Sequence, residues 1–327
     1  MVSALPASSP PPNWVESSHP LGWWINRLLA VEPLRRLLFW QARRLIIRTA
    51  EGRGLPWGQR RVMLQSAAEP LGGASTDAAV TIPAYYRARF HAYDQGNLCW
   101  AAACEAEQAP ASMALRVGPR ETTLEPAAAQ LRLRRAIFTA IEPSLDGRPQ
   151  RVLDLGCSVG VSTLALRDWL LERQGPGAEP ALQVEGLDLS PEMLAVARVR
   201  EAEQAGRAPI TWRHGAAEAT DLPAAAYDLI TLQFVCHELP QAATRAVLAE
   251  VARLLRPGGV VALVDQDPDS AVIRRLPVPI ATLLKSTEPY LEDYFRLDLP
   301  QALEQAGFQG LRSCAVDPRH RVLVARR

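Results

Sequence analysis

The segment 152–160, with the sequence VLDLGCSVG, constrains the fold of this chain more than any other stretch. Val152, Leu153 and Leu155 form the short apolar run of a buried parallel strand, and Asp154 lies near its carboxyl end. Gly156 allows the backbone to turn sharply and to approach a ligand. Gly160 allows a helix, expected over about 161–172, to begin close to the strand with its free N–H groups facing the same side. The segment therefore predicts a strand, a glycine loop and a helix around a nucleotide-type ligand site.

The spacing of the glycines separates two cofactor classes. A dinucleotide-binding loop needs G-x-G-x-x-G, but Ser158 stands where the second glycine is required, which disfavours a nicotinamide oxidoreductase. The order found here, D-x-G-x-x-x-G, resembles motif I of the class I S-adenosylmethionine (SAM) dependent methyltransferases. The resemblance implies that Asp154, Gly156, Cys157 and Gly160 bind SAM. For Cys157 the alternative is a small buried packing residue.

Further elements follow in the order of the same family. Residues 184–188 resemble its second strand, which ends in Asp188, the acid that in this family accepts hydrogen bonds from both ribose hydroxyls; Leu189 follows it. Ser190 and Pro191 predict the N-cap and first position of the next helix. We expect strands over 210–215, 227–235, 260–264, 311–316 and 322–325, and helices over 241–255 and 299–306.

The resemblance covers about residues 130–327 and implies an α/β fold. This is a Rossmann-like, doubly wound, mostly parallel seven-stranded sheet with an antiparallel last strand. An N-terminal helical extension and lid would precede it. We expect disorder over 1–20, the extension and lid over 21–130, and the SAM-binding domain over 131–327.

The adenine side departs from the family pattern. Many relatives carry Gly-Asp-Ala after the third strand, whereas this chain has Gly-Ala-Ala at 215–217. Adenine recognition would then fall to Glu218, to backbone groups near Ala217, or to Asp221. Phe234 ends the fourth strand, and is expected beside the cofactor because ligands bind at the carboxyl ends of parallel strands.

His237 and Glu238 are the candidate catalytic residues. They directly follow the fourth strand, and a histidine suits proton removal from a hydroxyl, an enol or an activated carbon. The alternative is that His237 caps a helix or only shapes the pocket. Asp265 and Asp267, just beyond the fifth strand, are further candidates near the acceptor. The histidines lack a metal-ligand spacing, so no metal is expected.

Two N-terminal segments carry further predictions. Between Trp14 and Arg61 there are nine arginines and three glutamates, together with several tryptophans. This composition over residues 21–65 fits peripheral contact with a membrane. The alternative, which we prefer, is a helix packed on the catalytic domain through one apolar face, formed by Leu34, Leu38, Ala42 and Leu45.

The second segment, about 81–117, is expected to fold over the cofactor and to shape the acceptor pocket. Its predicted substrate-binding residues are Tyr86, His91, Tyr93, Asn97 and Trp100. The sequences FHAYDQGNLCW at 90–100 and KSTEPYL at 285–291 resemble motifs of a poorly characterised group of these enzymes in cyanobacteria and plant plastids. For each aromatic residue, the alternative is a place in the core of a helical subdomain.

Composition sets the remaining expectations. The net charge of +1 gives no reason to expect a nucleic-acid partner. Five cysteines without paired spacing fit reduced thiols in a cytoplasmic protein. We expect a methyltransferase acting on a small molecule, and our hypothesis for the acceptor class is a lipophilic, quinone-like or isoprenoid molecule. The alternative is a SAM-binding regulatory or interaction module without catalysis. No oligomeric state is predicted.

Overall fold

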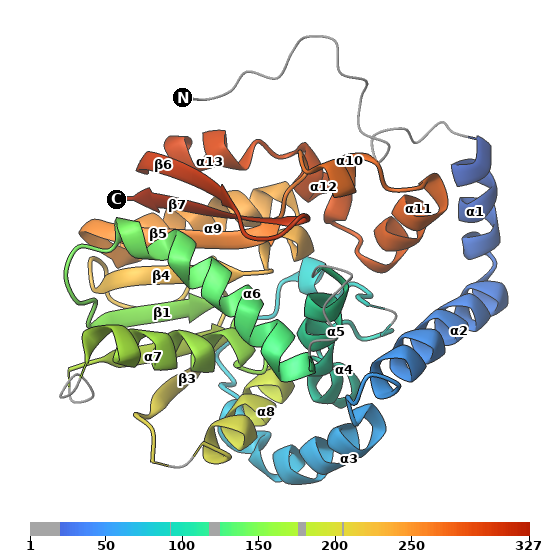
Figure 1. Ribbon diagram of the computed structural model, residues 1–327, viewed down its shortest axis with the longest axis horizontal. Helices are drawn as coiled ribbons and strands as arrows, with labels where there is room; N and C mark the ends of the chain where they lie inside the picture. The colour runs from blue at the N-terminus through green and yellow to red at the C-terminus, as the bar shows by residue number, and fades with distance from the viewer. Residues whose placement is uncertain (1–19, 92, 118–124, 176–180, 205) are drawn as a thin grey trace.

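The computed structural model describes residues 20–91, 93–117, 125–175, 181–204 and 206–327. The disorder predicted for residues 1–20 lies outside these ranges, apart from Pro20, which begins the first helix. The described part forms one seven-stranded sheet covered by helices, with further helices beyond its carboxyl edge (Figure 1).

The sheet has the strand order β3-β2-β1-β4-β5-β7-β6. Strands β1 to β5 pair in parallel, and β7 runs antiparallel between β5 and β6, which confirms the predicted reversed last strand. The order reverses between β1 and β4, and in open α/β sheets ligands bind at the carboxyl ends of the strands at such a point. The strands are β1 (Arg151–Leu155), β2 (Gln183–Asp188), β3 (Ile210–His214), β4 (Tyr227–Gln233), β5 (Leu255–Gln266), β6 (Gln309–Ala315) and β7 (His320–Arg326).

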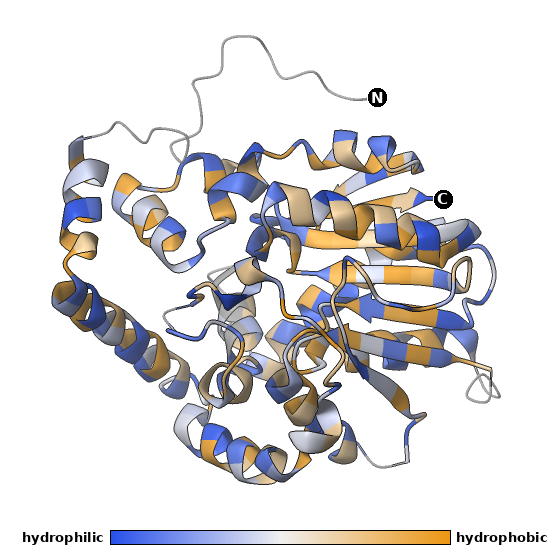
Figure 2. Cartoon of the chain, turned by 180° about the vertical axis from the view of Figure 1, so that it is seen from behind, coloured by the Kyte–Doolittle hydropathy of each residue, from blue (hydrophilic) through white to orange (hydrophobic). Residues whose placement is uncertain are grey.

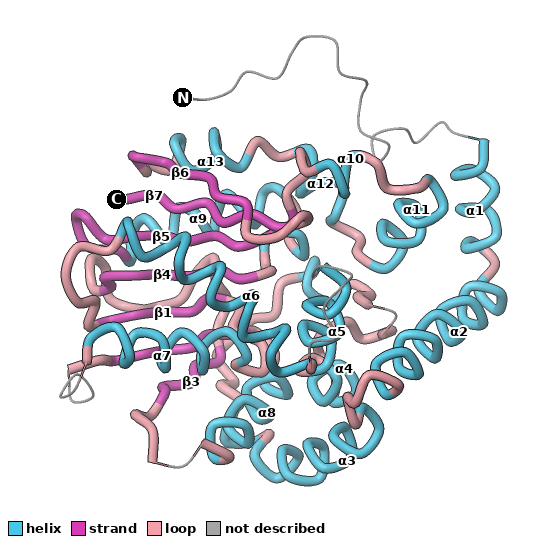
Figure 3. The backbone as a smooth tube through the Cα atoms, in the orientation of Figure 1, coloured by secondary structure: helices cyan, strands magenta, loops and turns pink. Residues whose placement is uncertain are grey.

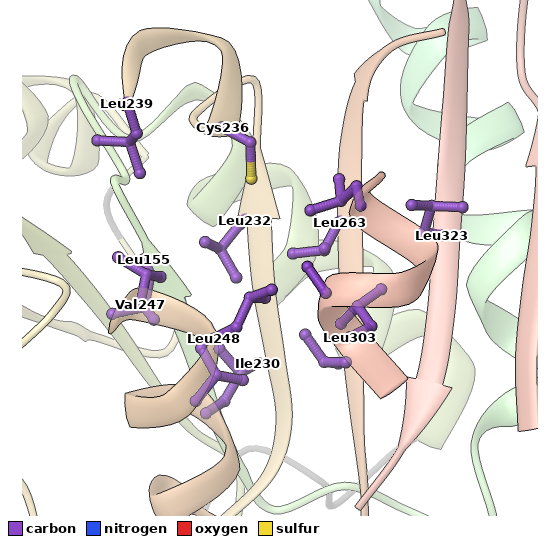
Figure 4. Packing of buried hydrophobic residues seen from close by; sticks show 14 of the residues in the cluster. Leu155, Ile230, Leu232, Cys236, Leu239, Val247, Leu248, Leu263, Leu303 and Leu323 are labelled. Carbon is purple, nitrogen blue, oxygen red and sulfur yellow. The ribbon is translucent and has the colours of Figure 1, made fainter. Parts of the chain in front are cut away.

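Apolar side chains bury both faces of this sheet. Helices α6 (Pro126–Ile141), α7 (Val161–Gln174) and α8 (Pro191–Ala202) contribute to the core on one face. Helices α9 (Gln241–Leu254), α12 (Leu291–Arg296) and α13 (Leu299–Gln305) contribute to the core on the other. Figure 2 shows the strands between these layers as largely hydrophobic. In Figure 4 residues of the strands, among them Leu155, Ile230, Leu232, Leu263 and Leu323, pack against Val247, Leu248 and Leu303 of the helices.

Shorter elements connect the layers. They are η4 (Glu142–Ser144), η5 (Cys236–Glu238), α10 (Ala271–Arg274) and α11 (Val278–Thr287). Helix α8 begins as the sequence predicts: Ser190 caps it by accepting the Met193 N–H at 3.2 Å, and Pro191 occupies the first helical position. Strand β5 begins at Leu255, and so it is longer than the strand predicted over 260–264.

The N-terminal part forms a chain of helices around the carboxyl edge of the sheet (Figure 1). It contains α1 (Pro20–Ala30), α2 (Glu32–Glu51), α3 (Trp57–Ala68), η1 (Glu69–Leu71), η2 (Gly73–Ser75), η3 (Ala84–Arg87), α4 (Trp100–Glu105) and α5 (Gln108–Val117). Helices α3 and α4 share a small apolar core with α8. The boundary expected between residues 130 and 131 falls inside α6, which begins at Pro126.

Helix α2 does not pack on the catalytic domain as we expected. Of the predicted apolar face, Leu38 is 36% exposed and Leu45 is 67% exposed. Trp40, on the same helix, is 53% exposed. The helix contacts its neighbours through its C-terminal half: Ala50 and Ile47 join a small core with Leu55 and Trp57, and Arg43 pairs with Glu105 of α4.

Two further findings concern the whole chain. All five cysteines are free thiols. Within the described ranges, no helix combines the length and the hydropathy that crossing a membrane requires.

Candidate functional site

The glycine loop after β1 has the backbone that the sequence predicts. Gly156 has φ +69°, and a Cβ there would lie 2.6 Å from Cγ2 of Val235. Gly160 has φ +74°, and the ring of Trp212 fills the place of its Cβ. The N–H groups of Gly156 and Cys157 both donate to the Leu187 carbonyl of β2, at 2.8 and 3.0 Å. The loop is therefore fixed against the end of β2 by a backbone that only glycine adopts without strain.

Asp154 lies beneath this loop and supports it. Its carboxylate is 1% exposed and accepts hydrogen bonds from three hydroxyls: Thr231 at 2.6 Å, Thr163 at 2.7 Å and Ser162 at 2.9 Å. Burial raises the pKa of Asp154, and these hydrogen bonds oppose that shift. The predicted cofactor residue thus ties β1 to β4 and to the start of α7, and its oxygens bind protein hydroxyls.

Asp188 ends β2 next to the loop. Its Oδ2 accepts the Ser158 N–H and its Oδ1 accepts the Ser190 N–H, both at 2.8 Å. The Tyr86 hydroxyl, from η3, lies 3.4 Å from Oδ1. Burial raises the pKa of Asp188 to about 6, although the two backbone hydrogen bonds favour the charged form. The carboxylate is held in one orientation, with acceptor capacity left beyond the two short bonds.

The predicted adenine side is covered by the N-terminal segment. Glu218 accepts a hydrogen bond from the Tyr85 hydroxyl at 2.7 Å. Ala217 is half-buried and packs against the core next to Tyr85. The carbonyl of the buried Leu189 lies 3.1 Å from Nε2 of His214. Glu218, Ala217 and Leu189 therefore follow β2 and β3 at the same edge of the sheet as Asp188.

Two other predicted cofactor residues, Cys157 and Phe234, have side chains that contact other parts of the protein. The Cys157 side chain is 1% exposed, and its Sγ packs under Gly186 of β2, as in the packing alternative. Phe234 has a φ of +63°, which is unusual for a bulky residue, and its ring meets His320 edge to face at 5.3 Å. Both side chains contact the protein core, so their ligand contacts would come from the backbone.

His237 and Asp265 form a buried pair at the carboxyl ends of β4 and β5. The Nδ1 of His237 lies 2.8 Å from Oδ1 of Asp265, and its backbone N–H donates to Oδ2 at 3.1 Å. Burial opposes a positive charge on this ring, but the charge of Asp265 and the hydrogen bond to it raise the pKa of His237 to about 10. Asp265, named above only as a further candidate, is the residue that orients His237.

Four other residues gather beside His237. Glu238 accepts a hydrogen bond from Asn97 at 2.8 Å, and its other oxygen lies 3.9 Å from Nδ1 of His91. The Nε2 of His91 lies 3.8 Å from Oε1 of Glu288. Burial raises the pKa of Glu238. We call His91, Asn97, His237, Glu238 and Glu288 the acid–histidine cluster.

The lid residues therefore divide into two groups. His91 and Asn97 join the cluster, and Tyr86 lies against Asp188. Tyr93 and Trp100 do not: the Tyr93 hydroxyl donates to Glu105 at 2.6 Å, and Trp100 packs beside η1 and α3. Their aromatic rings form the interior of the lid, which was the alternative for each of them. Figure 3 shows the loops of this segment passing along the carboxyl edge of the sheet.

Other residues of the site carried no signal in the sequence. Glu288 belongs to the KSTEPYL segment but had no predicted role. Arg134 of α6 is 6% exposed and donates to Oε1 of Gln233 at 2.6 Å, close beneath Asp154. Tyr290 packs against Tyr85 and Phe90, with its hydroxyl donating to the Tyr85 carbonyl at 3.1 Å. These contacts join segments far apart in the chain.

Sequence comparisons with known proteins relate this chain to methyltransferases. A family model described as a methyltransferase domain matches residues 152–259. An uncharacterized methyltransferase of Synechocystis sp., sll0829, is 31% identical over 163 residues, which cover 50% of this chain and 68% of that protein. A demethylmenaquinone methyltransferase of Lactiplantibacillus plantarum is 35% identical over 124 residues, 38% of this chain but only 48% of that protein.

Among solved structures, a SAM-dependent methyltransferase from Aquifex aeolicus is 20% identical to this chain, with a TM-score of 0.45. The alignment covers 66% of this chain and 97% of that one. The family-model match spans the glycine loop, Asp188 and the start of β5. S-adenosylmethionine is the cofactor of this family, and the chain belongs to the class I SAM-dependent methyltransferases.

Proposed function

We propose that this chain transfers the methyl group of SAM to a small molecule bound at the acid–histidine cluster. The observation that carries the proposal is the position of that cluster. Two residues of the N-terminal segment, His91 and Asn97, meet Glu238 just after β4, and Tyr86 of the same segment lies 3.4 Å from Asp188, which ends β2 on the other side of β1. Reactive side chains thus adjoin the predicted cofactor site.

The residues present fit SAM. The positive φ angles of Gly156 and Gly160 let the loop turn tightly, with Val235 and Trp212 filling the places of the missing Cβ atoms. The fixed carboxylate of Asp188 suits two ribose hydroxyls, and Glu218 with the backbone near Ala217 suits the adenine. When bound, SAM supplies a methyl group on a positively charged sulfur.

Methyl transfer is an in-line displacement, so holding the acceptor in place and excluding water supply much of the acceleration. In our proposal His237, oriented by Asp265, binds the acceptor through its second ring nitrogen. Glu238, held by Asn97, accepts the proton when the acceptor must lose one. Tyr85 and Tyr86 close the lid over the cofactor through Glu218 and Asp188.

A lipophilic acceptor with an aromatic ring fits the surroundings of the cluster. Tyr85, Phe90 and Tyr290 form a group of rings directly before and beside His91. The similarity to a demethylmenaquinone methyltransferase supports a quinone-like acceptor, although the match spans less than half of that protein. Isoprenoid acceptors belong to the same lipophilic class.

The exposed helices α1 and α2 support a second part of the proposal, contact with an anionic membrane surface. Together they carry six arginines and two glutamates. Arg27 lies over the ring of Trp23 at 4.9 Å, and Arg44 lies over the ring of Trp40 at 5.0 Å. Exposed apolar side chains lie among these arginines: Leu21, Trp23, Trp24, Leu28, Val31, Leu37, Leu38, Trp40, Leu45 and Ile46.

Positive charge mixed with exposed tryptophan is the composition that binds the interface of an anionic bilayer. Gly22 of α1 packs against Val278 and Thr282 of α11, whose far end leads to Glu288 of the cluster. We call α1 and α2 the basic–aromatic arm. A bilayer bound to this arm would lie on the side of the molecule from which a lipophilic acceptor could reach the cluster.

A non-catalytic SAM-binding module is the alternative in another functional class. It would keep the glycine loop and Asp188 but would have no use for the His237–Asp265 pair. The buried residues His237, Asp265 and Glu288 favour the enzyme, because burying ionisable groups costs free energy and a module that only binds SAM would have no use for them.

The experiment that tests the proposed function uses SAM labelled in its methyl group. Purified full-length protein is incubated with the labelled SAM and with separate lipid and polar extracts, and labelled products are identified by mass spectrometry. We expect label in a product of the lipid extract. Label only in polar products would contradict the lipophilic acceptor, and the absence of any product alongside measurable SAM binding would favour the non-catalytic module.

A further inference from the structure

The acid–histidine cluster also has the composition of a metal site. His91, His237 and Glu288 each offer one ligand atom, and these atoms lie within 4.8 Å of one another. They come from three separate segments: the lid loop, η5 after β4, and the end of α11. In the described ranges this is the only group of three such residues close enough to hold an ion.

The His237 ring is oriented as metal-bound histidines usually are, and the His91 ring lies between two carboxylates. In metal sites the ring nitrogen that does not bind the ion commonly donates to a carboxylate. Here Nδ1 of His237 lies 2.8 Å from Asp265, which leaves its Nε2 for a ligand. Nδ1 of His91 lies 3.9 Å from Glu238, while its Nε2 faces Glu288 at 3.8 Å. The His237 ring is thus held by a hydrogen-bonded carboxylate, and the His91 ring has a carboxylate near each of its two nitrogens, without a hydrogen bond to either.

Glu288 supplies an independent observation. The residue is 8% exposed, and its Oε2 is buried without a hydrogen-bond partner among the described residues. A buried carboxylate oxygen without a partner is costly, and such an atom in a folded protein calls for an unseen ligand. A cation between the two histidines would satisfy it.

The backbone holds His91 in place beside Glu288. His91 has a φ of +49°, a conformation that non-glycine residues rarely adopt. Its N–H donates to the Thr287 carbonyl at 2.9 Å, one residue before Glu288. The lid loop and the end of α11 are therefore joined at the point where His91 and Glu288 meet, and the unusual backbone is held there by this bond.

We propose that His91, His237 and Glu288 bind a divalent cation of the zinc, iron and manganese group. Two imidazole nitrogens and one carboxylate oxygen suit these ions, and three protein ligands leave coordination positions open. With the ion bound, the acceptor would contact the ion in place of Nε2 of His237: an open position beside Glu238 would bind an oxygen of the acceptor and lower the pKa of its hydroxyl. That use rests on the proposed function, whereas the binding of the ion does not. The ion was not expected from the sequence, because its ligands lie in distant segments.

Metal binding is tested on the full-length protein after treatment with a chelator. Equilibrium dialysis against Zn²⁺ and against Co²⁺, with the bound metal measured by mass spectrometry, should give about one equivalent per chain. Ligand-field absorption of the Co²⁺ form reports nitrogen and oxygen ligands. His91→Ala and Glu288→Gln should each lower the affinity at least tenfold, and Asp265→Asn should lower it about 10- to 100-fold.

Glu292→Gln is the matched control, because Glu292 lies on the surface of α12 and pairs with Lys285. It should bind metal as the wild type does, and SAM titrations should show that every variant is folded. Failure of the wild type to retain either ion, or wild-type affinity in the His91 and Glu288 variants, would overturn the proposal. Methyl transfer that persists without bound metal would overturn the role of the ion in the reaction and leave the proposed function intact.

Discussion

At the scale of single residues, the positions of the two strand-end acids are the main result. Asp154 and Asp188 were both predicted to bind the cofactor, but only Asp188 presents its carboxylate beside the lid. Asp154 accepts three hydroxyls from within the protein. The sequence places both acids at strand ends, but it does not indicate which neighbours supply hydroxyls, because Thr231 and Ser162 come from other elements.

Replacement of Asp188 by alanine should weaken SAM binding. It removes two ribose hydrogen bonds to a charged acceptor, each worth about 1.5 to 3 kcal/mol, or less where water substitutes. Calorimetric titration of the variant with SAM should show a dissociation constant at least tenfold higher. Asp188 also holds the Ser158 and Ser190 N–H groups, so circular dichroism must first show that the variant is folded. Unchanged affinity would contradict the ribose assignment.

The raised pKa of Asp188, about 6, predicts a pH dependence of SAM binding. The ribose hydroxyls donate to the ionised carboxylate, so binding favours the form without a proton. Above pH 7 that form is already present, and affinity should be nearly constant. Below pH 6 binding must displace the proton, and affinity should fall by up to tenfold per pH unit. Titrations from pH 5 to 8 check this; an equally steep profile in Asp188→Asn would assign the dependence to another group.

At the scale of elements, strands and helices of the catalytic domain could be predicted because their patterns are local. Short apolar runs predicted the strands, and Ser190 with Pro191 predicted the start of α8. The lid could be predicted only as a segment. The pattern of aromatic residues does not show whether a ring faces a pocket or a core, so Tyr93 and Trp100 were assigned to the substrate site but lie inside the lid. The exposure of α2 was missed likewise, since an apolar face does not reveal whether it has a partner.

The loop before α4 should depend on Gly96. Its φ is +57°, and a Cβ there would collide with the carbonyl oxygen of Ala88. Gly96→Ala therefore costs about 1 to 2 kcal/mol for the backbone conformation alone and must also move the loop that carries His91 and Asn97. We expect labelled methyl transfer to fall at least tenfold.

Gly73→Ala is the control for that change. Gly73 belongs to the same N-terminal region, and nothing lies within 4 Å of the position of its Cβ. Its transfer rate should stay within about twofold of the wild type. Equal losses in the two variants would show that the loop around Gly96 has no special part in the reaction.

At the scale of the whole molecule, a catalytic domain and an N-terminal part meet at one edge of the sheet. The lid reaches the ends of β2 and β4, and the basic–aromatic arm lies beyond it (Figure 1). No periodicity in the sequence could predict that His91, His237 and Glu288 meet, because the cluster depends on how the lid and α11 fold over the sheet.

Sedimentation with lipid vesicles tests the basic–aromatic arm. The protein should bind vesicles that contain phosphatidylglycerol more strongly than pure phosphatidylcholine vesicles, and salt should weaken that binding, since each basic residue near the surface contributes about 1 kcal/mol. Replacement of Trp24 and Trp40 by serine should reduce binding. Leu131→Ser is the control, because Leu131 is equally exposed, at 51%, on α6. Equal effects of the arm and control variants would contradict a specific arm.

The central claim is that the side chains at the ends of β4 and β5 act on an acceptor beside bound SAM. The most direct measurement compares labelled methyl transfer by the wild type and by His237→Ala at saturating SAM, with SAM affinity measured for both. We predict that the variant binds SAM within about threefold of the wild type and loses at least 99% of the transfer, about 2.7 kcal/mol of transition-state stabilisation. A variant that transfers the methyl group at the wild-type rate would contradict the account.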